Sequence, residues 1–227
     1  MQHFRLALIA LALCVASTGI ARERHRDAPA RADSASQSER AGDYDYFLLA
    51  LSWSPTYCKT HPDETEQCGR KGYGFIVHGL WPQYENGGGP QRCATDRGVD
   101  RQTADAALAF MPSRRLIHHE WGAHGSCSGL TPVKYFALID RAFAALQTPS
   151  ELKAPRRDLT MTSAQLRDAF KRANPGLDDD MMKLNCSRGD LVEVRVCLDR
   201  NLAPRTCGKR LRNACPRDDE FTIPASR

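Results

Sequence analysis

Three stretches of the chain place apolar residues at the spacing of a β-strand. Residues Tyr44–Trp53 form an apolar and aromatic run of strand length, which the Ser54-Pro55 pair ends. Leu191–Leu198 alternates and is rich in valine, and Phe75–Val77 is a shorter candidate entered through glycines. Because β-branched and aromatic residues suit the pleated surface of a sheet, each of these stretches predicts a strand.

Other stretches repeat apolar residues with the period of a helix. The pair Thr131-Pro132 has the capping and first-turn chemistry of a helix start. Apolar residues then follow three and four apart and predict an amphipathic helix, at Val133, Phe136, Ala137, Ile139, Phe143 and Leu146. Further helices are expected at Thr103–Met111 and at Ser163–Ala173, the latter capped by Thr162 or Ser163. Without regular βαβ alternation, these elements predict an α+β single domain with a mainly antiparallel central sheet packed by helices.

The N-terminal residues do not fit this pattern. Arg5 precedes a short apolar run, Leu6–Val15, and small residues lead to a cleavage point after Ala21. Residues 1–21 are therefore typical of a secretory signal peptide, which is too short for a membrane span. Residues 22–43 are polar, with as many acidic as basic side chains, and predict a disordered tether before an ordered domain at 44–227. We expect an exported protein, periplasmic or secreted, with no membrane partner.

The number of cysteines agrees with export. Of nine cysteines, Cys14 lies in the predicted signal peptide, and the remaining eight are Cys58, Cys68, Cys93, Cys127, Cys186, Cys197, Cys207 and Cys215. An even set in an exported chain predicts four disulfides, although the spacing alone allows about 105 pairings. No CxxC pair occurs, which argues against a structural zinc site.

Two segments concentrate the reactive side chains: FIVHGLWPQ at Phe75–Gln83 and HHEWGAHGSC at His118–Cys127. They hold four of the seven histidines and two of the three tryptophans. Histidine can take and give a proton near neutral pH, so a pair on separate segments predicts acid–base chemistry that needs no metal. The net charge of +5 suits a polyanionic substrate, although many unrelated proteins share it.

Cleavage of RNA requires the groups that these segments supply. The ribose 2′-OH must lose a proton, the leaving 5′-oxygen must gain one, and negative charge at phosphorus must be stabilised. His78 on one segment, with His119, Glu120 and His124 on the other, can meet these needs. The nucleophile belongs to the substrate, so no activated serine is needed, and DNA is excluded because it lacks the 2′-OH.

Both segments resemble the active-site segments of the ribonuclease T2 family, which includes the bacterial periplasmic ribonucleases. FLLALSWSPTYC and LNCSRGDLVEVRVCL resemble that family as well, so the likeness runs from about Tyr44 to Cys215. It implies a catalytic domain that cleaves single-stranded RNA through a 2′,3′-cyclic phosphate to 3′-phosphate ends, with low base specificity. It implies no cofactor and no metal, and we expect a monomer.

The same resemblance implies a role for each of five residues. His78 would be the general acid and His124 the general base, and the two would exchange roles in the second step. Glu120 would assist catalysis at the phosphate, and His119 would contact the phosphate. Trp81 would help to form a base-binding pocket, where stacking tolerates different bases.

The family also implies a disulfide pattern. The expected pairs are Cys58–Cys68, Cys93–Cys127, Cys186–Cys215 and Cys197–Cys207. The bridge of Cys93 with Cys127 would help to hold the two active-site segments in place relative to each other.

One position departs from the family. The family has a lysine before the last histidine of the second segment, and this chain has Ala123. Because loss of one charge-stabilising group can cost roughly 100- to 1000-fold in rate, either another cation replaces it or the enzyme is slower. We expect activity because both histidines and the glutamate are intact. The alternative is a weakened RNA-binding or cytotoxic secreted protein on the same fold.

Two other chemistries fit the segments less well. A zinc hydrolase would need an HExxH signature, but the histidine after His119-Glu120 falls one residue late, at His124, and leaves the shared helix face. A cysteine hydrolase would need a free thiol at Cys127, and a disulfide partner is expected there. Both are weaker hypotheses than the metal-free ribonuclease.

Overall fold

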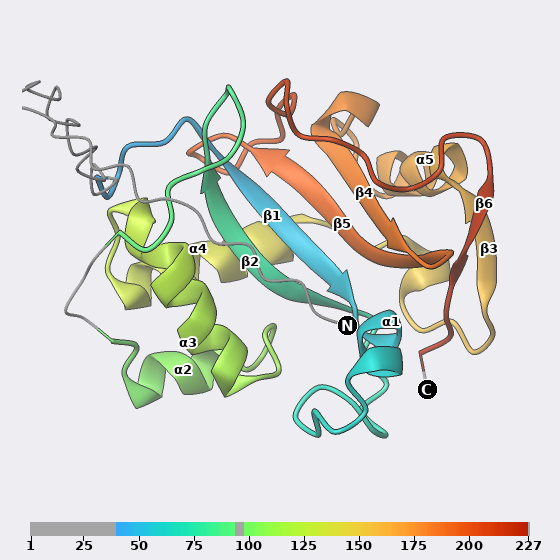
Figure 1. The fold of residues 1–227 in the computed structure, drawn as a ribbon, viewed down its shortest axis with the longest axis horizontal. Coiled ribbons are helices and arrows are strands. Elements are labelled where there is room, and N and C mark those ends of the chain that lie inside the picture. Colours follow the sequence, from blue (N-terminus) through green and yellow to red (C-terminus); the bar gives the residue numbers. More distant parts are fainter. Residues whose placement is uncertain (1–39, 94–97, 227) are drawn as a thin grey trace, which may run out of the picture. The chain divides into compact units, whose positions relative to one another are not determined.

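The computed structural model describes residues 40–93 and 98–226 (Figure 1). The predicted signal peptide and nearly all of the tether therefore lie outside the described residues. The strands are β1 Tyr46–Trp53, β2 Phe75–Gln83, β3 Leu159–Thr162, β4 Met182–Ser187, β5 Asp190–Leu198 and β6 Glu220–Ile223. The α-helices are α1 Ser54–Thr60, α2 Arg101–Ala107, α3 Arg114–Ala123, α4 Pro132–Ala145 and α5 Ser163–Ala173.

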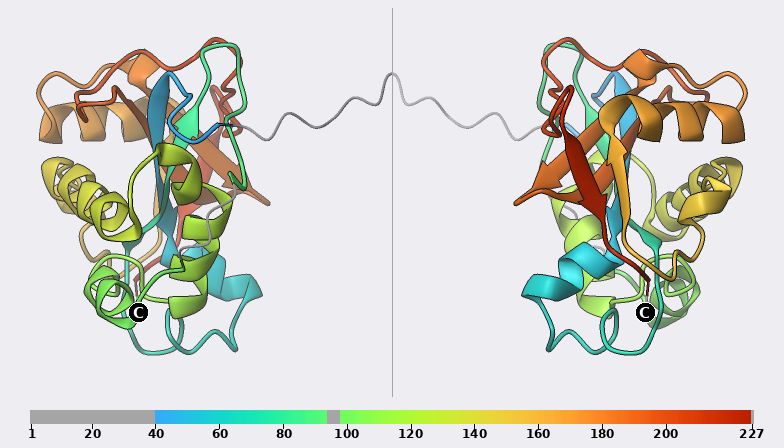
Figure 2. Two further views of the ribbon diagram at one scale, coloured as in Figure 1. Left: turned by 90° about the vertical axis from the view of Figure 1, so that its left-hand side faces the viewer. Right: turned by 90° about the vertical axis from the view of Figure 1, so that its right-hand side faces the viewer.

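The six strands form one sheet with the order β2-β1-β5-β6-β3, and β4 also pairs with β5. All pairings are antiparallel except the short parallel contact of β5 with β6. The two views of Figure 2 show α4 and α5 on one side of the sheet and α1 and α3 on the other. The predicted α+β domain with a mainly antiparallel sheet is confirmed.

Most of the core lies between the sheet and its helices. Residues of β1, β2 and β5, such as Leu49, Val77 and Val196, are fully buried in this cluster. Trp53 and Trp121 belong to this core and are 0% and 4% exposed.

Strand β2 is three times as long as predicted, since Phe75–Val77 was expected and the strand continues to Gln83. Gly79 and Pro82 concealed it, because both residues are unfavourable inside a strand. The strand tolerates Pro82 because it lies at the edge of the sheet. Its pairing with β1 slips where Ala50 faces Gly79 and Leu51 faces Val77, so that His78 lies in a β-bulge.

The three predicted helices are present, with two corrections. Helix α2 begins earlier than the expected Thr103–Met111, because Asp100 caps it by accepting from the Thr103 N–H at 2.9 Å, and it ends at Ala107. In α4, Val133 was expected in the apolar face but is 58% exposed, and Ala137 is exposed too. The buried face of α4 contains Pro132, Tyr135, Phe136, Ile139 and Ala142 instead.

Helix α5 matches its predicted bounds, and Thr162 is its cap. The Thr162 hydroxyl accepts from the Gln165 N–H, and the Gln165 side chain accepts from the Thr162 N–H, which forms a complete capping box.

Four disulfides staple the domain, and they join the same pairs that the family resemblance implies. One of them links Cys93, which follows the β2 segment, to Cys127, which follows α3. Four disulfides fit a protein of an oxidising compartment, either extracellular or periplasmic. Within residues 40–93 and 98–226, no helix has the length and apolar character needed to cross a membrane.

Candidate active site

Strand β2 and helix α3 bring the two histidine segments together. Helix α3 was not predicted, because Gly122 and Gly125 weaken helical propensity. It forms after Ser113, whose hydroxyl accepts from the Leu116 N–H at 3.4 Å, and it lies against β2. His124 is the residue that ends the helix. The Ser113 cap was the available signal for this element.

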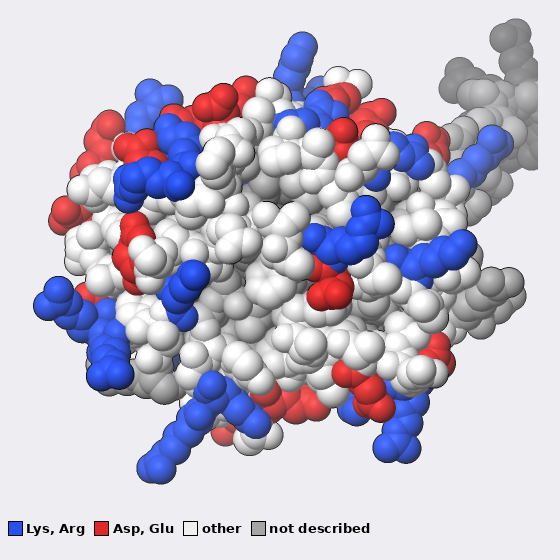
Figure 3. All heavy atoms as spheres, turned by 180° about the vertical axis from the view of Figure 1, so that it is seen from behind, with Lys and Arg blue, Asp and Glu red and all other residues white. Residues whose placement is uncertain are grey.

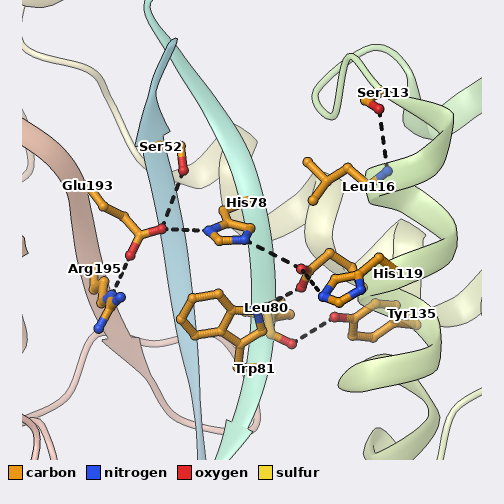
Figure 4. Close-up of polar contacts among 11 residues, drawn as sticks. Ser52, His78, Leu80, Trp81, Ser113, Leu116, His119, Tyr135, Glu193 and Arg195 are labelled. Carbon is orange, nitrogen blue, oxygen red and sulfur yellow. Dashed lines mark hydrogen bonds and ion pairs between the residues drawn. The ribbon is translucent and has the colours of Figure 1, made fainter. Parts of the chain in front are cut away.

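His78 points from the bulge of β2 toward two buried carboxylates (Figure 4). Its Nδ1 lies 2.7 Å from Oε1 of Glu193 on β5, and its Nε2 lies 3.6 Å from Oε1 of Glu120 on α3. The two carboxylate side chains are only 3% and 1% exposed, whereas the imidazole is 37% exposed. One ring nitrogen therefore faces the protein interior, and the other faces the second histidine segment.

Glu120 joins the strand to the helix. Its Oε2 accepts from Nε1 of Trp81 at 2.7 Å, and its Oε1 lies 4.0 Å from Nε2 of the exposed His119. The junction depends on Gly79, where an added Cβ would lie 2.1 Å from Oε2 and 2.3 Å from the indole nitrogen. Burial raises the pKa of Glu120 to about 7, against the opposing effects of His78 and Trp81.

Trp81 lies between the two central histidines. Its ring centroid is 5.1 Å from that of His78 and 5.3 Å from that of His124. Because the indole N–H is bonded to Glu120, Trp81 organises the site in addition to any contact with substrate. The expected stacking of a base on Trp81 stays a prediction.

His78 and His124 have opposite pKa shifts. Burial lowers the pKa of His78, but the hydrogen bond to Glu193 and the charges of Glu120 and Glu193 outweigh it, so the net shift is upward. Burial lowers the pKa of His124 to about 4, with further lowering by His119 and His78. Near neutral pH one imidazole is therefore biased toward the charged form and the other toward the neutral form.

The carboxylate of Glu193 was missed from the sequence. It lies 115 positions from His78, and only the pairing of β1 with β5 brings it near β2. A glutamate between the valines of LVEVRVCL was a usable signal, because an acidic residue in the middle of a buried strand needs a partner.

A cavity of about 300 Å³ opens beside His78 and His119. Aromatic, apolar and polar side chains line it, including Tyr57, Gln67 and Leu116. Its mixed lining and its position beside His78 are suited to a flat, polar ring such as a nucleobase.

Two further residues of the segments complete the site. Ala123 ends α3 with no charge, and its carbonyl accepts from the Arg92 N–H at 2.9 Å. Gln83 lies at the far end of β2, where its amide donates to the Pro82 carbonyl at 2.9 Å. Among the described residues, no three His, Cys, Asp or Glu side chains are grouped to hold a metal ion.

Comparison with known proteins places this arrangement in context. A profile described as "Ribonuclease T2 family" matches residues 44–207. The chain is 38% identical over 135 residues to a ribonuclease of Aeromonas hydrophila, which covers 60% of this chain and 57% of that protein. It is 33% identical over 163 residues to a probable ribonuclease of Haemophilus influenzae, a match that covers 63% of this chain and 59% of that protein. The chain thus spans less than two thirds of the length of either relative.

The fold is similar to that of solved structures. Trichomaglin, described as an S-like ribonuclease, superposes with a TM-score of 0.63 at 22% identity and covers 82% of this chain and 100% of its own. An RNase-related protein from Calystegia sepium superposes with a TM-score of 0.61 at 19% identity, and the match covers 81% of this chain and 98% of that protein. At these identities the likeness concerns the fold.

Proposed function

The chain belongs to the ribonuclease T2 family, and on that premise we propose that it is an endoribonuclease that cleaves single-stranded RNA without a metal or other cofactor. The observation that carries the proposal is the pair of histidines with opposite pKa shifts on either side of Trp81. Acid–base cleavage needs one proton donor and one proton acceptor at the same pH, and this pair supplies both.

In the first step, the neutral His124 accepts the proton of the ribose 2′-OH. The 2′-oxygen attacks phosphorus, the bond from phosphorus to the 5′-oxygen breaks, and the protonated His78 gives its proton to that oxygen. The products are a 2′,3′-cyclic phosphate and a free 5′-OH. The raised pKa of His78 and the lowered pKa of His124 agree with these roles.

In the second step, the two histidines exchange roles. His78, now neutral, accepts a proton from water, and the resulting hydroxide attacks the cyclic phosphate. The bond from phosphorus to the 2′-oxygen breaks, His124, now protonated, gives its proton to that oxygen, and the RNA is left with a 3′-phosphate. Each histidine ends the cycle in its initial state, as catalysis requires.

Glu120 and His119 face the place where the phosphate would lie. Nε2 of His78 lies 3.6 Å and Nε2 of His119 lies 4.0 Å from the same oxygen, Oε1 of Glu120. With a pKa of about 7, Glu120 is partly protonated near neutral pH and can donate a hydrogen bond to a phosphoryl oxygen. His119 would contact a second oxygen.

Ala123 supports the alternative of a weakened enzyme that mainly binds RNA. The methyl group supplies no charge at the end of α3, where the family resemblance implied a cation. We favour the active form because the acid, the base and the glutamate are present together. The weakened form predicts RNA binding without turnover.

The substrate is proposed to bind on the face that carries the cavity. The opposite, helix-covered face shows basic and acidic side chains interspersed around a broad uncharged area (Figure 3). Such a surface does not form the single-sign track that a polyanion follows. The mixed lining of the cavity supports low base specificity.

The proposal includes export and a monomeric state. Four disulfides support an oxidising compartment, and the basic and apolar pattern at residues 1–21 supports removal of a signal peptide. The finer choice between periplasm and full secretion would follow from fractionation of cells that express the full chain.

Digestion of total RNA in the presence of EDTA tests the proposed function. Wild type is expected to degrade the RNA and to release 2′,3′-cyclic phosphate ends first, while His78→Ala and His124→Ala leave it intact. Loss of activity in EDTA would overturn the metal-free mechanism. If wild type binds RNA but leaves it as intact as both variants do, the weakened form replaces the enzyme.

A further inference from the structure

We propose that Glu193, held by Arg195, is a positioning residue that orients His78 for proton transfer. This inference rests on the proposed ribonuclease function, because it assigns a role within the same site. Glu193 has no role in the steps described above. It nevertheless makes the shortest contact of His78 in the site.

Both oxygens of the Glu193 carboxylate are engaged (Figure 4). Oε1 accepts from Nδ1 of His78 at 2.7 Å and lies 3.4 Å from the Ser52 hydroxyl, while Oε2 accepts from Nε of Arg195 at 2.5 Å. The side chain is 3% exposed, so water cannot replace these partners. A buried carboxylate with a complete set of donors is held rigidly.

This contact decides which nitrogen of His78 does chemistry. An ionised carboxylate only accepts hydrogen bonds, so Nδ1 must carry a hydrogen in both charge states of the imidazole. The transferable proton is then on Nε2, the nitrogen that faces Glu120 and His119. Without the contact, the neutral ring could adopt the other tautomer and present a nitrogen that lacks the proton-accepting lone pair.

The backbone around His78 makes the contact more important. The residue lies in a bulge, so β1 does not pair with it in regular register. A bulge aims a side chain but provides weaker restraint than a paired strand. The Glu193 bond, from a strand on the other side of β1, supplies the missing restraint.

Charged and titratable groups from two elements, and from the residue that ends the second, surround His78. Glu193 and Arg195 extend from β5, Glu120 from α3, and His124 follows that helix. Burial raises the pKa of Glu193, but the bond from His78 and the charge of Arg195 outweigh it and keep the carboxylate ionised. Arg195 in turn lowers the pKa of His78, which limits the upward effect of the two carboxylates.

Arg195 also touches the other side of the site. Its guanidinium carbon lies 5.3 Å from the ring centroid of Trp81, and Trp81 donates to Glu120. The cation thus holds Glu193 directly and packs against the residue that holds Glu120. Replacing Arg195 would disturb both carboxylates, so Glu193 is the cleaner site to test.

The test is Glu193→Gln, with Asp190→Asn as the matched control. Glutamine keeps the size and one acceptor oxygen but removes the charge, and Asp190 is an ion-paired carboxylate of the same strand bonded to Lys59 at 2.6 Å. In Glu193→Gln we expect kcat to fall by about 100-fold with little change in KM, the cost of a misplaced catalytic group. Asp190→Asn should retain wild-type kcat.

The pH dependence separates positioning from simple stabilisation. Removing the Glu193 charge lowers the pKa of His78, so the alkaline limb of kcat/KM shifts to lower pH while the acidic limb stays in place. NMR titration of the imidazole nitrogens should show a lower pKa for His78 and a loss of the single Nδ1–H tautomer. A folded variant with an unchanged limb, pKa and tautomer would overturn the proposal.

The NMR measurement does not need turnover. If wild type fails to cleave RNA but Glu193→Gln changes the tautomer of His78, the ribonuclease function fails while the positioning role stands. If wild type cleaves RNA but His78 in the variant titrates as it does in wild type, the ribonuclease function stands and the positioning role of Glu193 fails. Should Glu193→Gln fail to fold, Ser52→Ala removes only the 3.4 Å contact to Oε1 and should give a smaller shift of the same sign.

Discussion

The two histidines of the site are the same side chain in two opposite surroundings. His78 lies in a strand, with a carboxylate on each ring nitrogen, and its pKa is raised. His124 lies at the end of a helix, where burial and two neighbouring histidines lower its pKa to about 4. Carboxylates outweigh the effect of burial on one ring, whereas burial and neighbouring histidines act together on the other, so the surroundings favour the charged form of His78 and the neutral form of His124.

The largest effect is expected when either histidine side chain of the pair is removed. His78→Ala and His124→Ala are each expected to lower kcat by about 100- to 10,000-fold, the usual contribution of a general acid or base. Rates of RNA cleavage, measured with matched protein concentrations, check the result. His118→Ala, at the exposed residue before His119, should retain activity. Equal losses in all three variants would contradict the assignment.

Glu120 contacts His78 and lies on the helix that His124 ends. Its replacement is expected to give the next largest loss of activity. Glu120→Gln keeps an acceptor for the Trp81 indole but removes the ionisable group near the phosphate. We expect a loss of about 100- to 1000-fold in kcat, as for removal of one group that stabilises developing charge. Steady-state kinetics measure it. The exposed Glu220→Gln is a control, and a similar loss there would indicate a general effect of charge.

A cation placed beside His124 would increase the electrostatic difference between His124 and His78. Ala123→Lys adds a charge at the end of α3, next to the histidine that is kept neutral. We expect the rate to rise by about 10- to 100-fold through stabilisation of charge at phosphorus, and the pKa of His124 to stay low. Ala137→Lys, at an exposed position of α4, makes the same change of net charge elsewhere. An equal gain from Ala137→Lys would show that only long-range attraction of RNA had improved.

The pH dependence of kcat/KM gives the last and smallest expected difference between the two histidines. Cleavage requires His124 without its proton and His78 with it, so kcat/KM should fall on the acidic side near pH 4 and on the alkaline side above pH 6.5. Glu120, with a pKa of about 7, titrates within the alkaline limb. In Glu120→Gln that limb should become a single titration, whereas the acidic limb should not move.

Local sequence patterns and long-range pairing differ in how far they could be predicted. The strand at β1, the helix α5 and the choice of His78, Glu120 and His124 as candidate site residues could be read from short segments of the sequence, while the roles of the three residues stay predictions. Elements that break local rules were shortened or missed, as with β2, where glycine and proline interrupt an edge strand. Glu193 was missed because its contact depends on the order of strands in the sheet.

Gly79 has a consequence for how such chains can vary. Its missing side chain is the space in which the indole of Trp81 meets the carboxylate of Glu120. Any other amino acid there must move the strand from the helix or give up that bond, because a Cβ would lie 2.1 Å from the oxygen. A related protein that has another residue at this position is therefore expected to keep the fold but to have lost the hydrogen bond between Trp81 and Glu120, and with it the activity. The identity of this one residue would then separate active members of the family from inactive ones.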